Sequence, residues 1–207
     1  MSIVTPWGYT LAGDVVTIPA MLTQAEFNAY TADKYAGDAR VTSEINAASN
    51  LIRNYIGWHL FPAMSCAANI PVLRMNGRVK YNAGEFLVQL PATHVPEVSS
   101  ILVGSTECTD FISEQNGLVH IFDPGCFDRR TIITVNYTAG LGPEFMDSVK
   151  ELIVNRIIHG LERNYGIQSQ TAGGVSISYA NSWNNDASTL SDNDRDLLIP
   201  FKVQGVY

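Results

Sequence analysis

Two segments of the chain repeat apolar residues every three or four positions, the spacing that gathers them on one side of an α-helix. The first segment covers residues 41–57, with Asp38 or Thr42 as its candidate N-cap, and the second covers residues 143–165. The second pattern is the strongest in the chain. Both patterns predict amphipathic helices that pack on each other through a core of Ile45, Ile52, Ile56, Val149, Ile153, Ile157 and Leu161.

Side chains that can cap a helix mark two shorter helices. Thr23 and Glu26 have the spacing of a capping box, in which the threonine oxygen accepts the Glu26 amide and the carboxylate reaches back. This pair predicts a helix over about residues 23–34. Ser191 precedes an acidic first turn and predicts a last short helix, which Pro200 ends because proline cannot continue it.

Between about residues 70 and 140 the hydrophobic period changes from helical spacing to two. Phe86, Val88 and Leu90 alternate with other residues, and the stretch from Thr131 to Tyr137 is rich in β-branched and aromatic side chains. Glycine and asparagine pairs separate these runs. The pattern predicts an antiparallel sheet of about five or six short strands, inserted between helices.

The order of these elements predicts an α+β protein, in which a small bundle of three to four helices carries an inserted antiparallel β module. We expect a single domain that begins with an N-terminal arm at residues 1–20. The helical core with its C-terminal tail then comes from residues 21–69 and 141–207, and the β module from residues 70–140. Within the second helical stretch, a flexible segment leads into one short strand at residues 175–179.

Charge and composition narrow the possible partners. Twenty acidic residues against 13 basic ones leave a net charge of −7, which disfavours a protein that grips nucleic-acid phosphates. Only 16 % of the residues are charged, below the roughly 25 % of an average soluble domain, and this favours surface buried in an assembly. We expect no secretion signal and no membrane association, because no stretch approaches the roughly 18 apolar residues of a membrane span.

The residues that usually carry chemistry lie too far apart in the sequence to form a recognisable site. His159 and Glu162 have a helical spacing that could offer two metal ligands, but we interpret them as an exposed ion pair because nothing supplies the remaining ligands. His120 lies in a predicted strand and is interpreted as a packing residue. Cys126 lies in a turn near two arginines, where an ordinary turn residue is the simpler interpretation.

The nucleophile elbow G-x-S-x-G and both phosphate-binding glycine motifs are absent from the sequence. The three cysteines cannot form a closed set of disulfides, and none of them has metal-ligand spacing. We therefore expect neither an enzyme nor a cofactor or metal, and the candidate functions that remain depend on surfaces.

Several short phrases resemble the head-tail connector proteins of tailed bacteriophages, also called adaptor or head-completion proteins. The phrases lie in the order of that family and cover about residues 20–203; they are residues 22–26, 45–57, 90–101, 133–141 and 197–202. The stretch from Ile133 to Leu141, for example, is similar to a family strand that ends in VTYTAGY. The chain departs from the family where Trp58 follows Gly57 in place of arginine, and in the length of residues 166–190, which include Trp183.

The resemblance implies a structural virion protein that forms a ring of twelve copies and docks on the portal protein at the head-tail interface, or neck. The ring would extend the DNA channel and offer a platform for a stopper or tail-completion protein. Genomic DNA would pass through the lumen without sequence-specific binding, and assembly would take place in the host cytoplasm. The residues implied in portal docking form the C-terminal tail: Leu197, Leu198, Ile199, Pro200, Phe201, Lys202, Val203, Val206 and Tyr207.

Two alternatives of other classes stay open at this point. Another neck or tail structural protein, such as a stopper or tail terminator, would share the assembly but should be dominated by a β-barrel. A β-sandwich recognition module would bind a carbohydrate or a protein partner through Tyr81, Phe86 and Phe127.

Overall fold

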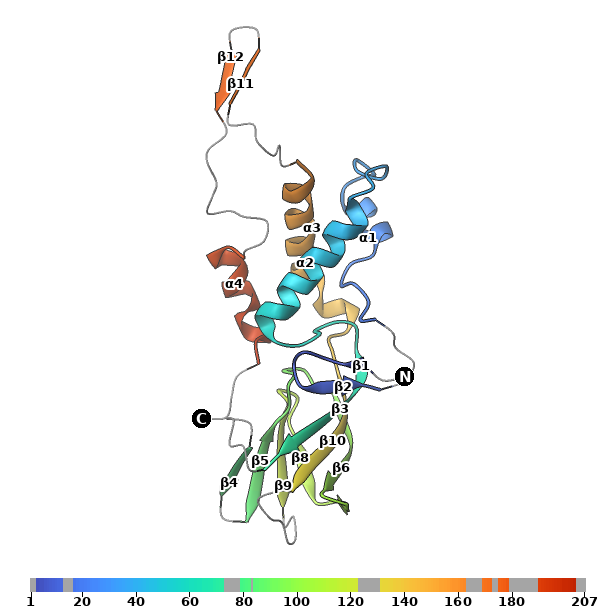
Figure 1. Ribbon diagram of the computed structural model, residues 1–207, viewed down its shortest axis with the longest axis vertical. Helices are drawn as coiled ribbons and strands as arrows, with labels where there is room; N and C mark the ends of the chain where they lie inside the picture. Colours follow the sequence, from blue (N-terminus) through green and yellow to red (C-terminus); the bar gives the residue numbers. More distant parts are fainter. Residues whose placement is uncertain are drawn as a thin grey trace. The chain divides into compact units, whose positions relative to one another are not determined.

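The chain folds into two units of different architecture (Figure 1). The computed structural model describes residues 3–12, 17–72, 79–82, 84–122, 131–162, 169–172, 175–178 and 190–203. The first unit, here called the β unit, combines Met1–Pro19, Arg53–Met146 and Ile199–Tyr207. The second, the helical unit, combines Ala20–Ile52 and Asp147–Leu198. The α+β class predicted from the sequence is confirmed.

The β unit contains two antiparallel sheets where the sequence predicts one. The larger sheet has the order β1-β2-β3-β10-β6-β7 and the smaller one β4-β5-β9-β8. The larger sheet is built from β1 (Ile3–Val4), β2 (Tyr9–Leu11), β3 (Met64–Pro71), β6 (Glu97–Val103), β7 (Thr106–Cys108) and β10 (Ile132–Ala139). The smaller one is built from β4 (Val79–Asn82), β5 (Glu85–Gln89), β8 (Phe111–Ser113) and β9 (Leu118–Phe122).

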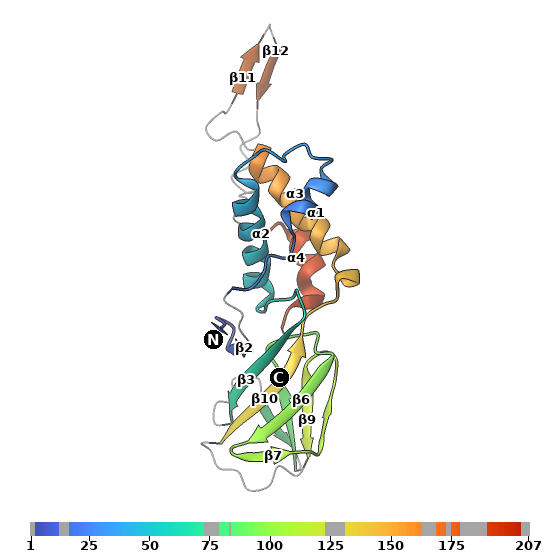
Figure 2. The same cartoon turned by 90° about the vertical axis from the view of Figure 1, so that its right-hand side faces the viewer.

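The core of the β unit lies between these two sheets, which face each other in Figure 2. Every second residue of β10 is buried, from Ile133 to Ala139, and β5 and β9 alternate in the same way. Such alternation is typical of strands with one face against a core. The period-two pattern therefore predicts which residues are buried, but it does not predict the change of sheet between β7 and β8.

Strand β3 draws residues that the sequence groups with the helices into the β unit. It pairs with β10 from end to end, from Met64 opposite Ala139 to Pro71 opposite Ile132. The N-terminal arm joins the same sheet, because Tyr9 in β2 pairs with Ala68 in β3. The boundaries of the β unit are thus wider than residues 70–140, since sheet pairing recruits strands from outside the period-two segment.

The helical unit contains α1 (Gln24–Tyr30), α3 (Asp147–Glu162), α4 (Asp192–Leu198) and most of α2 (Val41–Ile56). Thr23 and Glu26 form the predicted capping box of α1. This helix stops earlier than predicted, because Ala32 and Asp33 adopt positive φ angles and turn the chain. Before α2, Asp38 accepts the amide of Arg40, whereas Thr42 bonds to Gln24 instead.

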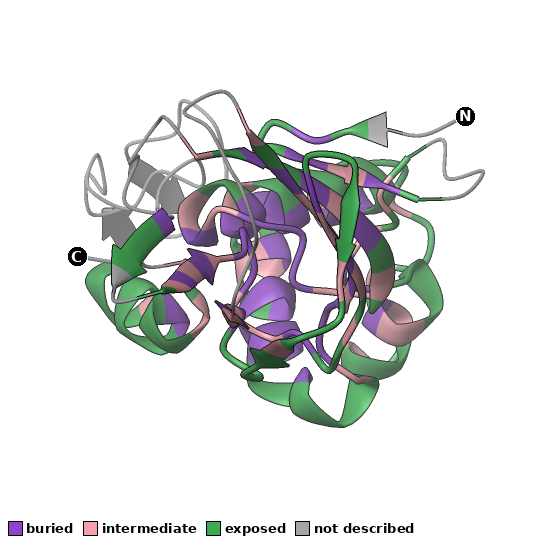
Figure 3. Cartoon of the chain, turned by 90° about the horizontal axis from the view of Figure 1, so that it is seen from below, coloured by how far each residue is buried: buried purple, intermediate pink, exposed green. Residues whose placement is uncertain are grey.

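The seven positions predicted as helix-packing core are buried; they are Ile45, Ile52, Ile56, Val149, Ile153, Ile157 and Leu161. Buried positions along the helices and strands are purple in Figure 3. Within the helical unit, α2 and α3 approach closely at Gly160, where an added Cβ would lie 2.9 Å from a Glu44 carboxylate oxygen. Among the described residues, no helix is both long and apolar enough to cross a membrane.

The remaining elements are a 3₁₀ turn, η1 (Pro143–Phe145), before α3, a second one, η2 (Ile199–Phe201), after α4, and a hairpin of β11 (Ser169–Ala172) and β12 (Val175–Ser178). The sequence predicts only the second strand of this hairpin and a flexible segment before it. Trp183 and Cys126 lie outside the described residues, as do Val206 and Tyr207.

Gly140 is a position where only glycine fits, and replacing it tests the packing of the β unit. Its φ of +133° is outside the range that other residues adopt readily, and a Cβ there would lie 2.4 Å from the Ala63 Cα. We expect Gly140→Ala to lower the free energy of unfolding by at least about 3 kcal/mol, measured by urea denaturation. Gly37→Ala is the matched control, because nothing lies within 4 Å of its Cβ position. Equal stability of the two variants would contradict this interpretation.

Ile153 tests the core of the helical unit. Its side chain is fully buried, so Ile153→Asp places an unpaired carboxylate in an apolar environment. We expect the free energy of unfolding to fall by about 4 kcal/mol or more. Asn155→Asp adds the same side chain at an exposed site of the same helix and should leave the melting temperature almost unchanged. If Ile153→Asp melts at the wild-type temperature, Ile153 does not lie in a packed core.

Candidate functional site

The C-terminal segment Ile199–Val203 is bonded to the β unit rather than free. The Trp58 indole N–H donates to the carbonyl of Phe201 at 2.7 Å, and the Thr93 hydroxyl donates to the same oxygen at 3.1 Å. The Val203 amide donates to the carbonyl of Ile56 at 3.1 Å. These contacts fix the path of the chain as far as Val203.

The end of helix α2 creates this anchor. Gly57 has a φ of +84° and donates its amide to the Arg53 carbonyl, which ends the helix in the left-handed conformation that favours glycine. Trp58 follows with its ring fully buried, so its N–H needs a partner inside the protein. The Phe201 carbonyl provides that partner. Beside it, the Lys202 ammonium lies 4.8 Å from the centre of the Tyr55 ring, a cation–π contact.

A buried polar cluster lies next to Trp58 in the β unit. The Nε2 atom of His59 lies 2.9 Å from the Ala139 carbonyl oxygen, which can only accept, so Nε2 carries the proton. Nδ1 therefore accepts the Tyr9 hydroxyl at 2.7 Å, and the Tyr9 oxygen in turn accepts the His59 amide at 3.0 Å. The cluster links β2, the α2–β3 connection and the end of β10.

Burial shifts the pKa values of this cluster away from the charged forms. Burial lowers the pKa of His59 to about 4 and raises the pKa of the Tyr9 hydroxyl well above its usual value. Burial also lowers the pKa of Arg53 to about 10, yet the guanidinium stays charged near neutral pH. The Arg53 donors reach the carbonyls of His59, Phe61 and Pro19. The partners of Arg53 and of His59 Nε2 are backbone carbonyls, so the cluster holds the connecting segments of the β unit in place.

The docking residues implied by the family resemblance differ in exposure. Leu197 is 38 % exposed and Ile199 48 % exposed, and Pro200 and Lys202 are exposed as well. Phe201 and Val203 are half-buried. Leu198 is fully buried, so in this conformation it offers no docking surface.

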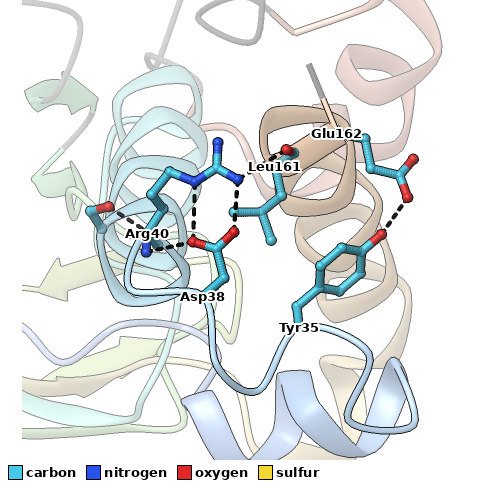
Figure 4. A network of polar contacts seen from close by, with 6 residues as sticks. Tyr35, Asp38, Arg40, Leu161 and Glu162 are labelled. Atoms are coloured by element: carbon cyan, nitrogen blue, oxygen red, sulfur yellow. Dashed lines mark hydrogen bonds and ion pairs between the residues drawn. The ribbon is translucent and has the colours of Figure 1, made fainter. Parts of the chain in front are cut away.

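A second polar network lies within the helical unit, where the α1–α2 connection meets the end of α3 (Figure 4). The Tyr35 hydroxyl and the Lys34 ammonium both donate to the Glu162 carboxylate, and both hold its pKa below the usual range. Arg40 donates to the Leu161 carbonyl at 3.1 Å and forms a bidentate pair with Asp38. Lys34 is thus the ion-pair partner of Glu162 at 2.7 Å, and the charge of His159 adds a smaller effect that also lowers the Glu162 pKa.

His120 is not a packing residue, contrary to the interpretation from its strand position. It is half-buried on β9, with Nδ1 hydrogen-bonded to Glu85 and Nε2 3.0 Å from a Glu114 oxygen. The Glu85 hydrogen bond is the main cause that raises the pKa of His120. Within the described part of the chain, no three histidine, cysteine or acidic side chains are placed to hold a metal ion.

The aromatic surface proposed for a recognition module is incomplete. Tyr81 is 52 % exposed, but Phe86 is 1 % exposed and lies in the core of the β unit. Phe127 lies outside the described residues. A buried Phe86 cannot contact a carbohydrate, so this alternative loses one of its three contact residues.

The sequence model of one protein family, described as head completion protein, matches residues 20–190. The chain belongs to the head completion protein family. This family is a structural one of bacteriophages, and its members are virion components near the head. A search of curated proteins found no match.

The family match ends at residue 190, before the anchored C-terminal segment, so the structure alone reveals how that segment is held. Sequence reasoning missed the roles of Trp58, Arg53 and His59. The only signal was Gly57 at the helix end, because the partners of Trp58 and His59 lie far along the chain.

Trp58→Phe tests whether the indole N–H holds the C-terminal segment. The substitution keeps an aromatic ring but removes the donor, so we expect faster hydrogen exchange at the Val203 amide and a loss of about 1 to 3 kcal/mol in unfolding free energy. Trp7→Phe is the matched control and should leave the Val203 exchange rate unchanged. Unchanged exchange in both variants would show that this hydrogen bond does not retain the segment.

The buried state of His59 makes stability depend on pH in a defined direction. Its folded pKa of about 4 lies below the value of the unfolded chain, about 6.5, so the unfolded state binds more protons between these values. Stability from this group is complete above pH 6.5 and falls by up to about 1.4 kcal/mol per pH unit towards pH 4.

NMR titration of the imidazole signals checks this assignment directly. The His59 ring should stay neutral from pH 7 down to pH 5, whereas His120, whose pKa is raised, should already be protonated at pH 6. A His59 midpoint near 6.5 would contradict the buried tautomer assigned above.

Proposed function

We propose that this head completion protein is a head-tail connector, which docks as a ring of twelve copies on the portal protein. The ring extends the DNA channel and offers a platform for a stopper or tail-completion protein. The observation that carries the proposal is the anchored C-terminal segment. Hydrogen bonds from Trp58, Thr93 and Val203 hold the chain up to its last four residues. The chain is therefore held as far as Val203, the residue before the proposed docking peptide at residues 204–207.

The sequence of these last four residues suits insertion into an apolar site. Gln204, Gly205, Val206 and Tyr207 carry no side-chain charge. A short peptide that starts from a fixed point loses less conformational entropy on binding than a longer free tail. The portal protein supplies the site in this proposal.

The charge of the chain supports the role of a conduit. A net charge of −7 weakens attraction to DNA phosphates, so the duplex can slide through the lumen without being held. The low charged fraction of 16 % suits subunits that bury their sides against neighbours in a heterologous ring.

Light scattering on the purified protein, alone and mixed with portal rings of the same phage, tests this function. We expect a ring-sized complex with portal, and loss of that complex when the chain is truncated after Val203. The truncation spares Phe201 and Val203, so the melting temperature should stay at the wild-type value. Val206→Ala is the matched full-length control, with weaker binding rather than none.

Each outcome of this assay decides between the proposals. A full-length protein that stays a 22.7 kDa monomer with portal present would overturn the connector function. If the truncated chain still forms the complex, the ring proposal stands, but residues 204–207 do not dock on the portal.

A further inference from the structure

The hairpin of β11 and β12 forms a two-stranded sheet of its own. Ser169 pairs with Ser178 and Ala172 with Val175, which leaves Gly173 and Gly174 between the strands. Among the described strands, neither β11 nor β12 is hydrogen-bonded to a strand of the other two sheets. Each therefore has one edge whose backbone donors and acceptors are not used by this chain's sheets.

An isolated two-stranded hairpin is at best marginally stable in water and gains stability when further strands pair with it. Two central residues that favour positive φ angles, such as Gly-Gly, specify this type of hairpin strongly. The hairpin is thus a unit that the other described sheets do not complete.

The hairpin also lacks the features that keep exposed edges apart. Proteins protect edge strands with charged residues, lysine in particular, and with proline. No charged residue and no proline occurs from Asn164 to Asn185. In the β unit, two of the four edge strands carry a charged residue, Lys80 in β4 and Glu107 in β7, and the other two, β1 and β8, are only two and three residues long. The hairpin strands have four residues each and no charged residue, so they have neither of these two protections, which favours pairing of their free edges.

We propose that the hairpin pairs edge to edge with the same hairpin of neighbouring copies, so that the hairpins of one ring form a closed antiparallel β-barrel. The proposal rests on the ring of the proposed function. Rotation about the ring axis gives every β11 one direction and every β12 the opposite one. The β12 edge of each copy then meets the β11 edge of the next copy in antiparallel orientation.

The geometry of a closed ring favours a second copy of this chain as the pairing partner of the hairpin. A hairpin has two different edges, and a head-to-tail contact that uses both of them closes only in a ring or continues as a filament. A closed barrel leaves no edge unpaired. Twelve copies would supply about 24 strands, more than the roughly 16 to 18 strands of porin barrels that enclose a water-filled channel.

The composition of the hairpin fits the wall of a DNA channel. Its described strands contain serine, threonine, glutamine, alanine, valine and isoleucine, and none of these side chains is charged. A wall without fixed charge neither holds nor repels the phosphates of a passing duplex. This composition also suits strands from different copies, because no like charges meet across the new pairs.

Cysteine cross-linking between two differently labelled chains tests the pairing. Chains with Ile177→Cys are mixed with chains that carry Ser169→Cys, Gln170→Cys, Thr171→Cys or Ala172→Cys, and rings are assembled on portal. The background carries Cys108→Ser and Cys126→Ser, whereas Cys66 is buried and stays. The four β11 positions are all tested because the register between β12 of one copy and β11 of the next is not known in advance.

We expect a disulfide-linked dimer on denaturing gels for at least one mixture and for no single-cysteine chain assembled alone. This asymmetry is specific to a β12 edge that meets a β11 edge. Rings that form without any such dimer would overturn the barrel while the connector function stands. Dimers of equal yield in the unmixed controls would also overturn it, because they indicate contact between identical strands.

Failure of the proposed function has a different signature. If light scattering shows no ring on the portal, that result contradicts the connector proposal without any cross-linking data. The barrel proposal is then contradicted too, because it depends on the ring. If a cysteine at 169–172 reacts with portal instead of with Ile177→Cys chains, the hairpin adds to a portal sheet and not to its own copies.

Discussion

The buried guanidinium of Arg53 is the constraint on which the β unit depends. A buried charge is costly unless its donors are bonded, and Arg53 bonds to the carbonyls of Pro19, His59 and Phe61. These carbonyls belong to the end of the N-terminal arm and to the connection between α2 and β3. One side chain at the end of a helix therefore fixes the path of two loops, and His59 and Trp58 take their places from the second of them.

A series of hydrogen bonds leads from the buried residues around Arg53 to the candidate docking segment at the C-terminus. His59 bonds to Tyr9 and to the end of β10, and Trp58 bonds to Phe201. Because these contacts lie in one unit, the core that stabilises the β unit also holds the C-terminal segment.

The helical unit uses exposed charges for a different purpose. Glu162 joins the last turn of α3 to Lys34 and Tyr35, and Arg40 bonds to the Leu161 carbonyl at the same helix end (Figure 4). Exposed pairs of this kind contribute little stability, because water and salt screen them. Their role is to fix the end of α3, after which the chain continues towards β11.

The sequence by itself determined the local features of this protein. Capping at Thr23 and Ser191, the helical spacing from Val149 to Leu161 and the alternation in β10 depend on near neighbours, so their periods are visible in the sequence. The division into two sheets, the partners of Glu162 and His120, and the anchor from Trp58 to Phe201 were decided by the tertiary structure. Residues 58 and 201 are 143 positions apart, and no local pattern records which distant carbonyl a buried N–H will reach.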